Sequence, residues 1–332
     1  MKAGSICVLG AGSWGTALAI LLAQQGKTCH LWAHSVEHAQ QLDTAHSNER
    51  YLPGISFPET LLIETDLKQA VTNAEIILVA VPSHAFRETL QKISPALQAE
   101  HHIAWASKGL EASSHKLLSQ ILIEELGDQI PFAVLSGPTF AREVAIGLPT
   151  AITVASSDEA FSKKFAGRLH TETFRAYTSK DVTGVQIGGA VKNVLAIASG
   201  IADGLGFGAN TRAALITRGL AEMSRLGHQL NAEPATFMGL AGLGDLVLTC
   251  TDDQSRNRRF GKALAAGSPK EQAFADIGQI VEGALTAKVI HEFADELNVD
   301  MPICEQVYRV IYQGLPARQA VTELLHRSQK AE

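Results

Sequence analysis

The chain has 332 residues, of which 46% are hydrophobic and 19% are charged, and its formal net charge is −6. This composition excludes a disordered chain, and at roughly 100–200 residues per domain the length predicts two domains. An acidic chain also lacks the basic surface that non-specific binding to nucleic acids or membranes requires, although a few local cations can still hold a small anion.

The cysteines and the N-terminus indicate the compartment. Cys7, Cys29, Cys250 and Cys304 lie far apart, with no CxxC spacing, which is typical of reduced cysteines in the cytoplasm. The N-terminus does not have the pattern of a signal peptide, and we find no run of about 18 apolar residues that would span a bilayer. We therefore expect a cytoplasmic protein without stable membrane insertion.

Short apolar segments alternate with helical segments over about the first 180 residues. The expected strands are residues 5–10, 28–33, 75–81, 102–106, 132–136 and 151–155. Expected helices between them include residues 16–25, 85–92 and 115–125. Uninterrupted apolar strands such as residues 76–81 suit a parallel sheet that is covered on both faces. The alternation predicts an α/β fold with an N-terminal Rossmann-like, doubly wound and mostly parallel sheet.

Beyond about Lys180 the strand patterns disappear and helical patterns dominate. The expected helices are residues 187–201, 211–226, 255–265 and 286–297. Seven glycines lie between positions 184 and 208, and a glycine inside a helix costs roughly 0.5–1 kcal/mol relative to alanine. They predict a close approach of the backbone to another helix or to a ligand. We expect domains at residues 1–186 and 187–332, the second of them all-α.

The first expected strand leads directly into GAGSWG, residues 10–15, and then into a helix. In this position the GxGxxG pattern predicts a dinucleotide-binding loop. Gly10 permits the tight turn, Gly12 lets the backbone approach a pyrophosphate, and Gly15 lets the helix pack closely on the strand. The phosphates then lie at the helix N-terminus. A glycine-rich turn without a ligand is the structural alternative.

The second expected strand ends in Ala33 and His34, where an NAD-selective enzyme has an acidic residue that binds the ribose hydroxyls. No carboxylate is present there to repel a 2′-phosphate, and His34 can pair with one. We therefore expect NADP to be accepted at least as well as NAD. Alternatively, His34 is only a solvated residue at the end of a strand.

Two further strand ends carry groups that suit an anion, at the edge where open α/β sheets bind ligands. Lys108, in Ser107-Lys108-Gly109, can reach both cofactor and substrate. The segment SGPTFARE, residues 136–143, exposes backbone N–H groups in a turn suited to an oxyanion. Taken singly, each segment is explained equally well as an ordinary loop.

Lys192 is the only charged residue between Asp181 and Asp203, and it lies in an apolar stretch rich in small residues. A lysine in such surroundings is costly unless it is paired or functional. Desolvation and a second nearby cation lower the pKa of a lysine and make it usable as a base. The alternatives are a lysine that extends to solvent and, for the neighbouring Asn193, a residue that satisfies backbone groups.

Three later segments add polar candidates. AGLGD, residues 241–245, is expected to be a turn that presents the carboxylate of Asp245. SRNRR, residues 255–259, places three arginines in four positions, and the guanidinium group suits phosphate oxygens, although a solvated basic face is the usual alternative. IVEG, residues 280–283, places Glu282 in an apolar segment.

The remaining motifs are weaker. His34 and His38 are four residues apart, but no third ligand is evident, so we expect no metal site. Residues 51–54, YLPG, are expected to form a rigid structural loop.

Together the motifs resemble one family, the bacterial-type NAD(P)-dependent glycerol-3-phosphate dehydrogenases, over nearly the whole chain. The resemblance rests on eight motifs in the same order, which makes it highly specific: GAGSWGTALA (10–19), RYLPG (50–54), SKGLE (107–111), SGPTFAREV (136–144), VKNVLAIASGIADGLGFGAN (191–210), GLGDL (242–246), SRNRRFG (255–261) and VEG (281–283).

The resemblance implies reversible hydride transfer between glycerol 3-phosphate and dihydroxyacetone phosphate, with NAD or NADP as cofactor and Lys192 as the proton acceptor. The implied substrate-binding residues are Lys108, Gly137, Thr139, Lys192, Asp245, Ser255, Arg256 and Asn257. Cofactor-binding residues beside Gly10, Gly12 and Gly15 are Ser13, Trp14, His34, Lys108, Ala141, Arg256, Ile280 and Glu282. The family has arginine or histidine at the second strand end, so His34 leaves the cofactor preference open.

The resemblance further implies that the first domain binds the dinucleotide and that the helical domain binds substrate and carries out catalysis. It also implies a supply of glycerol 3-phosphate for phospholipid synthesis, and a homodimer is the expected assembly. A β-hydroxyacid or 6-phosphogluconate type dehydrogenase shares the two domains and the lysine–asparagine pair, but SRNRRFG argues against it. A redox-sensing regulator that binds a dinucleotide without turnover would have no use for a buried lysine.

Overall fold

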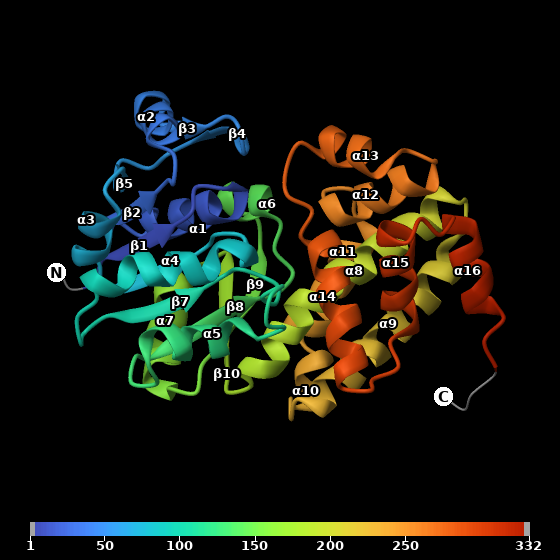
Figure 1. Ribbon diagram of the computed structural model, residues 1–332. Helices are drawn as coiled ribbons and strands as arrows, with labels where there is room; N and C mark the ends of the chain where they lie inside the picture. Colours follow the sequence, from blue (N-terminus) through green and yellow to red (C-terminus); the bar gives the residue numbers. More distant parts are fainter. Residues whose placement is uncertain (1–3, 329–332) are drawn as a thin grey trace. The chain divides into compact units, whose positions relative to one another are not determined.

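The computed structural model describes residues 4–328, which form two compact units (Figure 1). The first unit contains the described residues up to Ser107 together with Leu118–Val185. The second contains Lys108–Leu117 and the described residues from Gln186 onward. The division lies one residue before the expected boundary, but the segment Lys108–Leu117 belongs to the helical unit, which differs from the expected assignment of residues 1–186.

The first unit is built on an eight-stranded sheet in the order β10-β9-β8-β7-β6-β1-β2-β5. Its strands are β1 (Ile6–Leu9), β2 (Cys29–Trp32), β5 (Leu61–Glu64), β6 (Ile76–Val79), β7 (His102–Trp105), β8 (Phe132–Ser136), β9 (Thr150–Ala155) and β10 (Phe174–Ser179). Neighbouring strands are parallel except β8 and β9. Strands β1, β2 and β6 are buried along their whole length. The expected mostly parallel sheet is confirmed, although β5 and β10 were not predicted.

Helices cover both faces of this sheet. Helices α1 (Ser13–Ala23), α6 (Ala141–Ala145) and α7 (Glu159–Leu169) form one packed group, and α3 (Leu67–Thr72), α4 (Phe86–Ile93) and α5 (Leu118–Leu126) form another. The chain crosses from β1 to β2 in one direction and from β6 through β7 to β8 in the other. Because such crossovers are right-handed, the two groups lie on opposite faces.

The remaining elements of the first unit lie outside the main sheet. They are α2 (Val36–Ala45), β3 (Ser47–Asn48), β4 (Leu52–Ser56) and the short 3₁₀ turns η1 (Ser83–Ala85) and η2 (Ser94–Ala96). Residues 51–54 are not the expected loop, because Leu52 begins β4, which pairs with β3 in an antiparallel arrangement.

The switch in chain direction positions the candidate residues of the first unit. Strand β1 lies between β2 and β6, so the connections leave it in opposite directions. Open α/β sheets bind ligands at such a point, at the carboxyl ends of the strands. Gly10, His34 and Gly137 follow β1, β2 and β8, which run in the same direction. These three residues therefore lie at one edge of the sheet.

The second unit is helical, and its described residues add only an isolated bridge between Leu110 and Leu117. Its helices are α8 (Val182–Gly204, which begins in the first unit), α9 (Ala209–Gln229), α10 (Pro234–Phe237), α11 (Asp245–Thr251), α12 (Arg256–Ala265), α13 (Lys270–Ile277), α14 (Glu282–Glu296), α15 (Pro302–Tyr312) and α16 (Ala317–Leu325). A π-helical turn, η3 (Leu240–Gly244), leads into α11. The expected all-helical region after the sheet is confirmed.

Glycines let the helices of this unit approach α8 closely. A Cβ added at Gly188 would lie 2.3 Å from the carbonyl oxygen of Ala241, and one at Gly200 would lie 2.0 Å from that of Arg258. On α12, a Cβ at Gly261 would lie 2.1 Å from the carbonyl oxygen of Ile197. These separations exclude any larger residue without movement of the backbone. The predicted close approach is therefore that of one helix to another.

Two stretches are long and apolar enough to resemble membrane spans by composition, Val182–Gly204 and Pro234–Thr251. The apolar window of the first is completely buried, as in the core helix of a globular protein. The second is not one regular helix but α10, η3 and α11 in succession, and 39% of its window is buried. Both stretches are thus parts of the folded helical unit.

Candidate active site

The loop after β1 has the backbone geometry that a dinucleotide requires. Gly10 has a φ of +118°, and a Cβ there would lie 2.9 Å from the carbonyl oxygen of Ala80. A Cβ on Gly15 would lie 1.9 Å from the carbonyl oxygen of Gly10, so α1 packs directly on the loop. A Cβ on Gly12, the N-cap of α1, would meet nothing within 4 Å. That open space at the helix N-terminus fits a pyrophosphate.

Side chains around this loop fit the same group. The Oγ of Ser13 donates to the carbonyl oxygen of Tyr51 at 2.7 Å. The indole Nε1 of Trp14 is buried and has no hydrogen-bond partner among residues 4–328. His34 is exposed after β2, and its ring stacks on Trp32 with centroids 6.0 Å apart. The first unit therefore offers a backbone cradle, a buried donor and an exposed imidazole.

The turn after β8 holds the next group of predicted residues. Gly137 has a φ of +158°, and a Cβ there would lie 3.1 Å from the Cα of Ile152. The Oγ1 of Thr139 donates to the carbonyl oxygen of Gly137 at 3.2 Å, and Ala141 begins α6. The three predicted residues thus belong to one tight turn at the carboxyl edge of the sheet.

Two lysines and one aspartate meet in the second unit. Asp245 accepts from the Nζ of Lys108 at 2.6 Å through Oδ2 and lies 3.0 Å from the Nζ of Lys192 through Oδ1. Lys192 comes from α8, Asp245 is the first residue of α11, and Lys108 comes from the segment Lys108–Leu117. Lys192 is 8% exposed and Asp245 1% exposed. The structure therefore brings together three of the predicted site residues within one unit.

Burial and charge set the protonation of this triad. Burial lowers the pKa of Lys192, Asp245 raises it and Lys108 lowers it, with a net result of about 8. For Asp245, burial favours the neutral acid, but the two ammonium groups outweigh burial and hold the pKa of the carboxyl below its ordinary value. Lys192 can therefore exchange a proton near neutral pH, while Asp245 stays ionised.

The segment that carries Lys108 is attached to the helical unit along its length. Leu110 and Leu117 are buried in the hydrophobic core of that unit. His115 lies against α14, with Nδ1 2.8 Å from Glu296 and Nε2 3.1 Å from Glu292. Lys108 is thus held beside Asp245 by contacts of the second unit, although its position just after β7 had predicted a residue of the sheet domain.

Thr249 is a functional candidate that the sequence analysis missed. Its Oγ1 accepts from the Nζ of Lys192 at 3.0 Å and lies 2.6 Å from the carbonyl oxygen of Asp245, to which it donates. Residues four apart on a helix lie on the same face, so Asp245 would have indicated Thr249 if a helix had been expected there. The expected turn at residues 241–245 is instead a π-helical turn followed directly by α11.

A pair of asparagines joins three helix segments beside Lys192. The Nδ2 of Asn257 donates to Oδ1 of Asn193 at 2.9 Å, and the backbone N–H of Gly283 donates to Oδ1 of Asn257 at 2.9 Å. A Cβ on Gly283 would lie 2.4 Å from the carbonyl oxygen of Asn193. The start of α12 and the start of α14 are therefore fixed on α8 one residue from Lys192.

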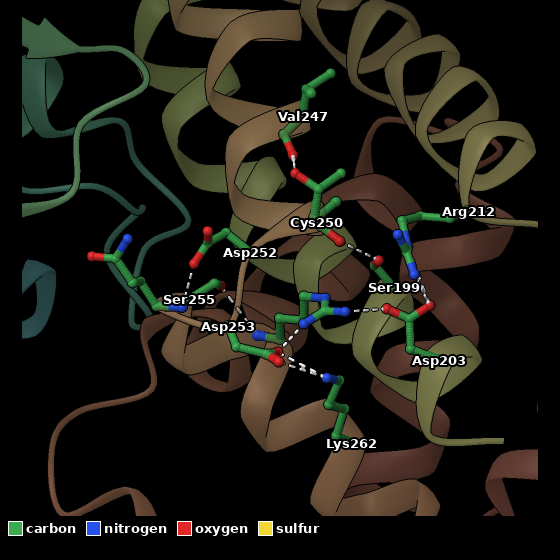
Figure 2. Close-up of polar contacts among 12 residues, drawn as sticks. Ser199, Asp203, Arg212, Val247, Cys250, Asp252, Asp253, Ser255 and Lys262 are labelled. Atoms are coloured by element: carbon green, nitrogen blue, oxygen red, sulfur yellow. Dashed lines mark hydrogen bonds and ion pairs between the residues drawn. The ribbon is translucent and has the colours of Figure 1, made fainter. Parts of the chain in front are cut away.

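The predicted arginine cluster does not act as one patch. Ser255 is the N-cap of α12, where its Oγ accepts from the backbone N–H of Arg258 at 3.2 Å. Arg256 donates to the Oε1 of Gln279 at 3.1 Å, whereas the guanidinium of Arg258 lies 2.5 Å from the carboxylate of Asp203, and both of these side chains are buried. Asp203 also accepts from Arg212, as Figure 2 shows. Of Arg256 and Arg258, only Arg256 remains a candidate for an anionic ligand.

The last two predicted residues lie where α14 begins. Glu282 is the first residue of that helix, and Ile280, two residues earlier, is 41% exposed. Burial lowers the pKa of the Arg256 guanidinium and the carboxylate of Glu282 raises it, which places Glu282 near Arg256. Ile280 and Glu282 both lie close in sequence to Gln279, the partner of Arg256.

Sequence comparison identifies the family. Models of the N-terminal and C-terminal parts of NAD-dependent glycerol-3-phosphate dehydrogenase match residues 5–162 and 181–322. The chain belongs to the NAD-dependent glycerol-3-phosphate dehydrogenase family. A family member from Vibrio cholerae, a glycerol-3-phosphate dehydrogenase (NAD(P)+), is 55% identical over 326 residues, which cover 98% of this chain and 95% of that protein. One of the same name from Colwellia psychrerythraea is 56% identical over 331 residues, which cover 99% of each.

Solved structures of dehydrogenases from this family have the same fold. The crystal structure of glycerol-3-phosphate dehydrogenase from Coxiella burnetii is similar with a TM-score of 0.95 at 48% identity, over 97% of this chain and 99% of that one. The enzyme from Saccharomyces cerevisiae gives a TM-score of 0.84 at 28% identity, with 97% and 99% covered. The protein is therefore an NAD(P)-dependent oxidoreductase of this dehydrogenase family, and the resemblance drawn from the motifs is confirmed.

Proposed function

We propose that the protein interconverts sn-glycerol 3-phosphate and dihydroxyacetone phosphate with NAD or NADP, and that Lys192 transfers the proton. The observation that carries the proposal is the buried triad in which Asp245 lies between Lys192 and Lys108 and the pKa of Lys192 is about 8. The relatives named as NAD(P)+ glycerol-3-phosphate dehydrogenases support the choice of substrate.

Lys192 has the environment of a general acid–base group. In the oxidation, the neutral amine accepts the proton of the C2 hydroxyl, and in the reduction the ammonium donates a proton to the C2 oxygen. The nicotinamide ring, when bound, accepts or supplies the hydride. Lys108 orients the substrate oxygen, and Asp245 keeps both amines in place.

The remaining residues bind the ligands. In the first unit we assign the dinucleotide to Gly10, Gly12, Ser13, Trp14, Gly15, His34 and Ala141, and the substrate to Gly137 and Thr139. In the second unit we assign the substrate to Lys108, Lys192, Asp245, Ser255, Arg256 and Asn257, and the cofactor to Lys108, Arg256, Ile280 and Glu282. Arg256 holds the phosphate, which takes no part in the reaction but supplies binding energy that positions C2.

The direct test is the oxidation of NADH and of NADPH by the purified protein with dihydroxyacetone phosphate, compared with 2-oxo acids. We expect turnover with the phosphotriose and none with the 2-oxo acids. Activity only with 2-oxo acids would assign the protein to the β-hydroxyacid type, and tight dinucleotide binding without any turnover would make it a sensor. Strong rejection of NADPH would show that His34 does not bind the 2′-phosphate of NADP.

The replacement Asp245→Asn tests the electrostatic part of the proposal. Asp245 favours the ammonium form of Lys192, so its loss lowers the pKa of Lys192 further below about 8. An adjacent opposite charge is worth about 1–3 pKa units. We therefore expect two limbs of the pH–rate profiles to move to lower pH by about that amount: the rise of kcat with pH for glycerol 3-phosphate oxidation, and the decline of kcat with pH for the reduction. Full pH–rate profiles in both directions measure these two limbs.

The matched control is Asp276→Asn, which removes an exposed carboxylate from α13 of the same unit. It should leave both pH limbs in place. If the limbs stay where they are in Asp245→Asn as well, Lys192 is not the group that titrates.

The cellular role follows from the reaction. We propose that this soluble enzyme works in the cytoplasm as a homodimer and supplies glycerol 3-phosphate for phospholipid synthesis. Loss of the gene should then make growth depend on added glycerol 3-phosphate, and light scattering of the purified protein tests the dimer.

A further inference from the structure

Arg258 and Asp203 form the buried centre of an ion network in the helical unit, whose other members are more exposed. The side chain of Arg258 is 6% exposed, and its guanidinium contacts two carboxylates, Asp203 on α8 at 2.5 Å through Nη2 and Asp253 through Nη1. Figure 2 shows Arg212 beside Asp203 and Lys262 beside Asp253. Asp203 is also buried, with a side-chain exposure of 7%.

The network connects the end of α8 with the loop before α12 and with the first turn of α12. Asp203 lies in the last turn of α8, and Asp253 lies in the loop that precedes α12. Arg258 is the side chain that contacts both, while Arg212 from α9 reaches only Asp203 and Lys262 reaches only Asp253 in the recorded contacts. Removing Arg258 therefore separates the loop from α8 and leaves a buried carboxylate with one cation fewer.

The geometry of α12 relates this network to the proposed phosphate residues. Successive residues of a helix are 100° apart, so Arg256 and Arg258 project from nearly opposite sides of the first turn. Behind that turn, a Cβ on Gly200 would lie 2.0 Å from the carbonyl oxygen of Arg258, which shows that the backbones of α8 and α12 touch here. Helix α8 also carries Lys192, so one helix holds both the proposed base and the anchor of Arg258.

We infer that Arg258 is a positioning residue for phosphate recognition: by tying the first turn of α12 to Asp203, it fixes Arg256 and Asn257 at a set distance from Lys192. This inference rests on the proposed function, in which Arg256 and Asn257 bind the phosphate. The pairing of Asn257 with Asn193 also holds this turn on α8, but a single neutral hydrogen bond at 2.9 Å contributes less than the charge-assisted pair of Arg258 with Asp203.

The test compares a substrate that has the phosphate with one that lacks it. For Arg258→Ala we expect kcat/KM with dihydroxyacetone phosphate to fall about 10- to 100-fold, the effect of misplacing a binding group by about 1 Å. With dihydroxyacetone, which has no phosphate to position, kcat/KM should stay at the wild-type value. A purely structural role would lower both by the same factor, and that result would overturn the inference.

Two milder variants keep the test decisive if Arg258→Ala does not fold. Arg258→Lys retains the charge but cannot form the two-armed contact, and Asp253→Asn removes the arm that is 60% exposed at low structural cost. Each should lower the ratio of kcat/KM with dihydroxyacetone phosphate to kcat/KM with dihydroxyacetone, by a smaller factor than Arg258→Ala does. A wild-type ratio in both folded variants would refute the role of Arg258.

Arg259→Ala is the matched control, since it removes an arginine from the next position of the same helix, where the side chain is exposed. It should leave the ratio unchanged. The wild-type assay separates the two proposals: absence of phosphotriose turnover rejects the proposed function, whereas normal turnover with an unchanged ratio in the Arg258 and Asp253 variants rejects only this inference.

Discussion

Replacing Lys192 by alanine is expected to lower kcat about 10³- to 10⁴-fold in both directions, the upper part of the range for loss of a general acid–base group. Lys192 is buried and paired with Asp245, and its pKa of about 8 lets it both accept and donate a proton near neutral pH. In the wild type, the rate of oxidation should rise with pH through about 8, where the amine becomes neutral, and the rate of reduction should decline over the same interval. In Lys192→Ala both limbs should be absent, which steady-state pH profiles measure.

Lys192→Arg separates proton transfer from charge. Arginine keeps the positive charge but does not lose its proton in proteins, so this variant should be as inactive as Lys192→Ala in the oxidation direction. The matched control Lys288→Ala removes an exposed lysine from α14 and should have normal kcat. Dinucleotide titration by fluorescence should give the wild-type Kd in all three proteins. A near-normal kcat for either Lys192 variant would contradict the assignment of Lys192 as the base.

The sheet was predictable because its strands are buried on both faces. The strands at β1, β6 and β8 are continuous apolar runs between turn residues, so composition alone marks them. Strand β10 was missed because it lies at the edge of the sheet, and its sequence FRAYTS is polar at several positions and partly exposed. Strand β4 was missed because its second and third residues, Pro53 and Gly54, are typical of a loop.

The position of Lys108 shows why site geometry was less accessible. From sequence, a lysine directly after β7 belongs to the sheet domain, since nothing local indicates that the chain leaves that domain for ten residues and returns. The segment joins the helical unit because Leu110 and Leu117 enter its core and His115 meets carboxylates nearly two hundred positions away in the chain. Such contacts are long-range, and no periodicity or motif encodes them.

The SRNRR segment illustrates a second limit. A run of three arginines predicted one cationic patch, but the turn of the helix sends Arg256 and Arg258 to different sides, and the buried Asp203 pairs with Arg258. For Lys192 and the glycines of α8, in contrast, the sequence was sufficient to predict the environment of the residues. A single charge in an apolar helix already indicates burial, and repeated glycines already indicate close contact, because each would be costly without that reason.

Arg256→Ala is expected to lower kcat/KM for dihydroxyacetone phosphate by about 30- to 5,000-fold, since truncating one partner of a desolvated charge pair costs about 2–5 kcal/mol. The Nη1 of Arg256 donates to Gln279, and among residues 4–328 no carboxylate oxygen is recorded within 4.0 Å of this guanidinium, although Glu282 lies near enough to act on its charge. The guanidinium of Arg256 is therefore available to an anionic ligand, in contrast to Arg258. For dihydroxyacetone at saturating cofactor the same variant should lose much less of its kcat/KM, so that the preference for the phosphorylated substrate is what disappears.

Arg256→Lys refines this expectation. A lysine supplies the charge without the planar, two-donor geometry that matches a phosphate, so its preference should lie between those of the wild type and Arg256→Ala. The exposed Arg259 again provides the control, because Arg259→Ala removes the same charge from the same helix. An unchanged preference in Arg256→Ala would remove Arg256 from the phosphate site. In the double variant Arg256→Ala/Arg258→Ala, the loss of Arg258 should cost less preference than it costs in the wild type, because one of the two groups that Arg258 positions is already gone.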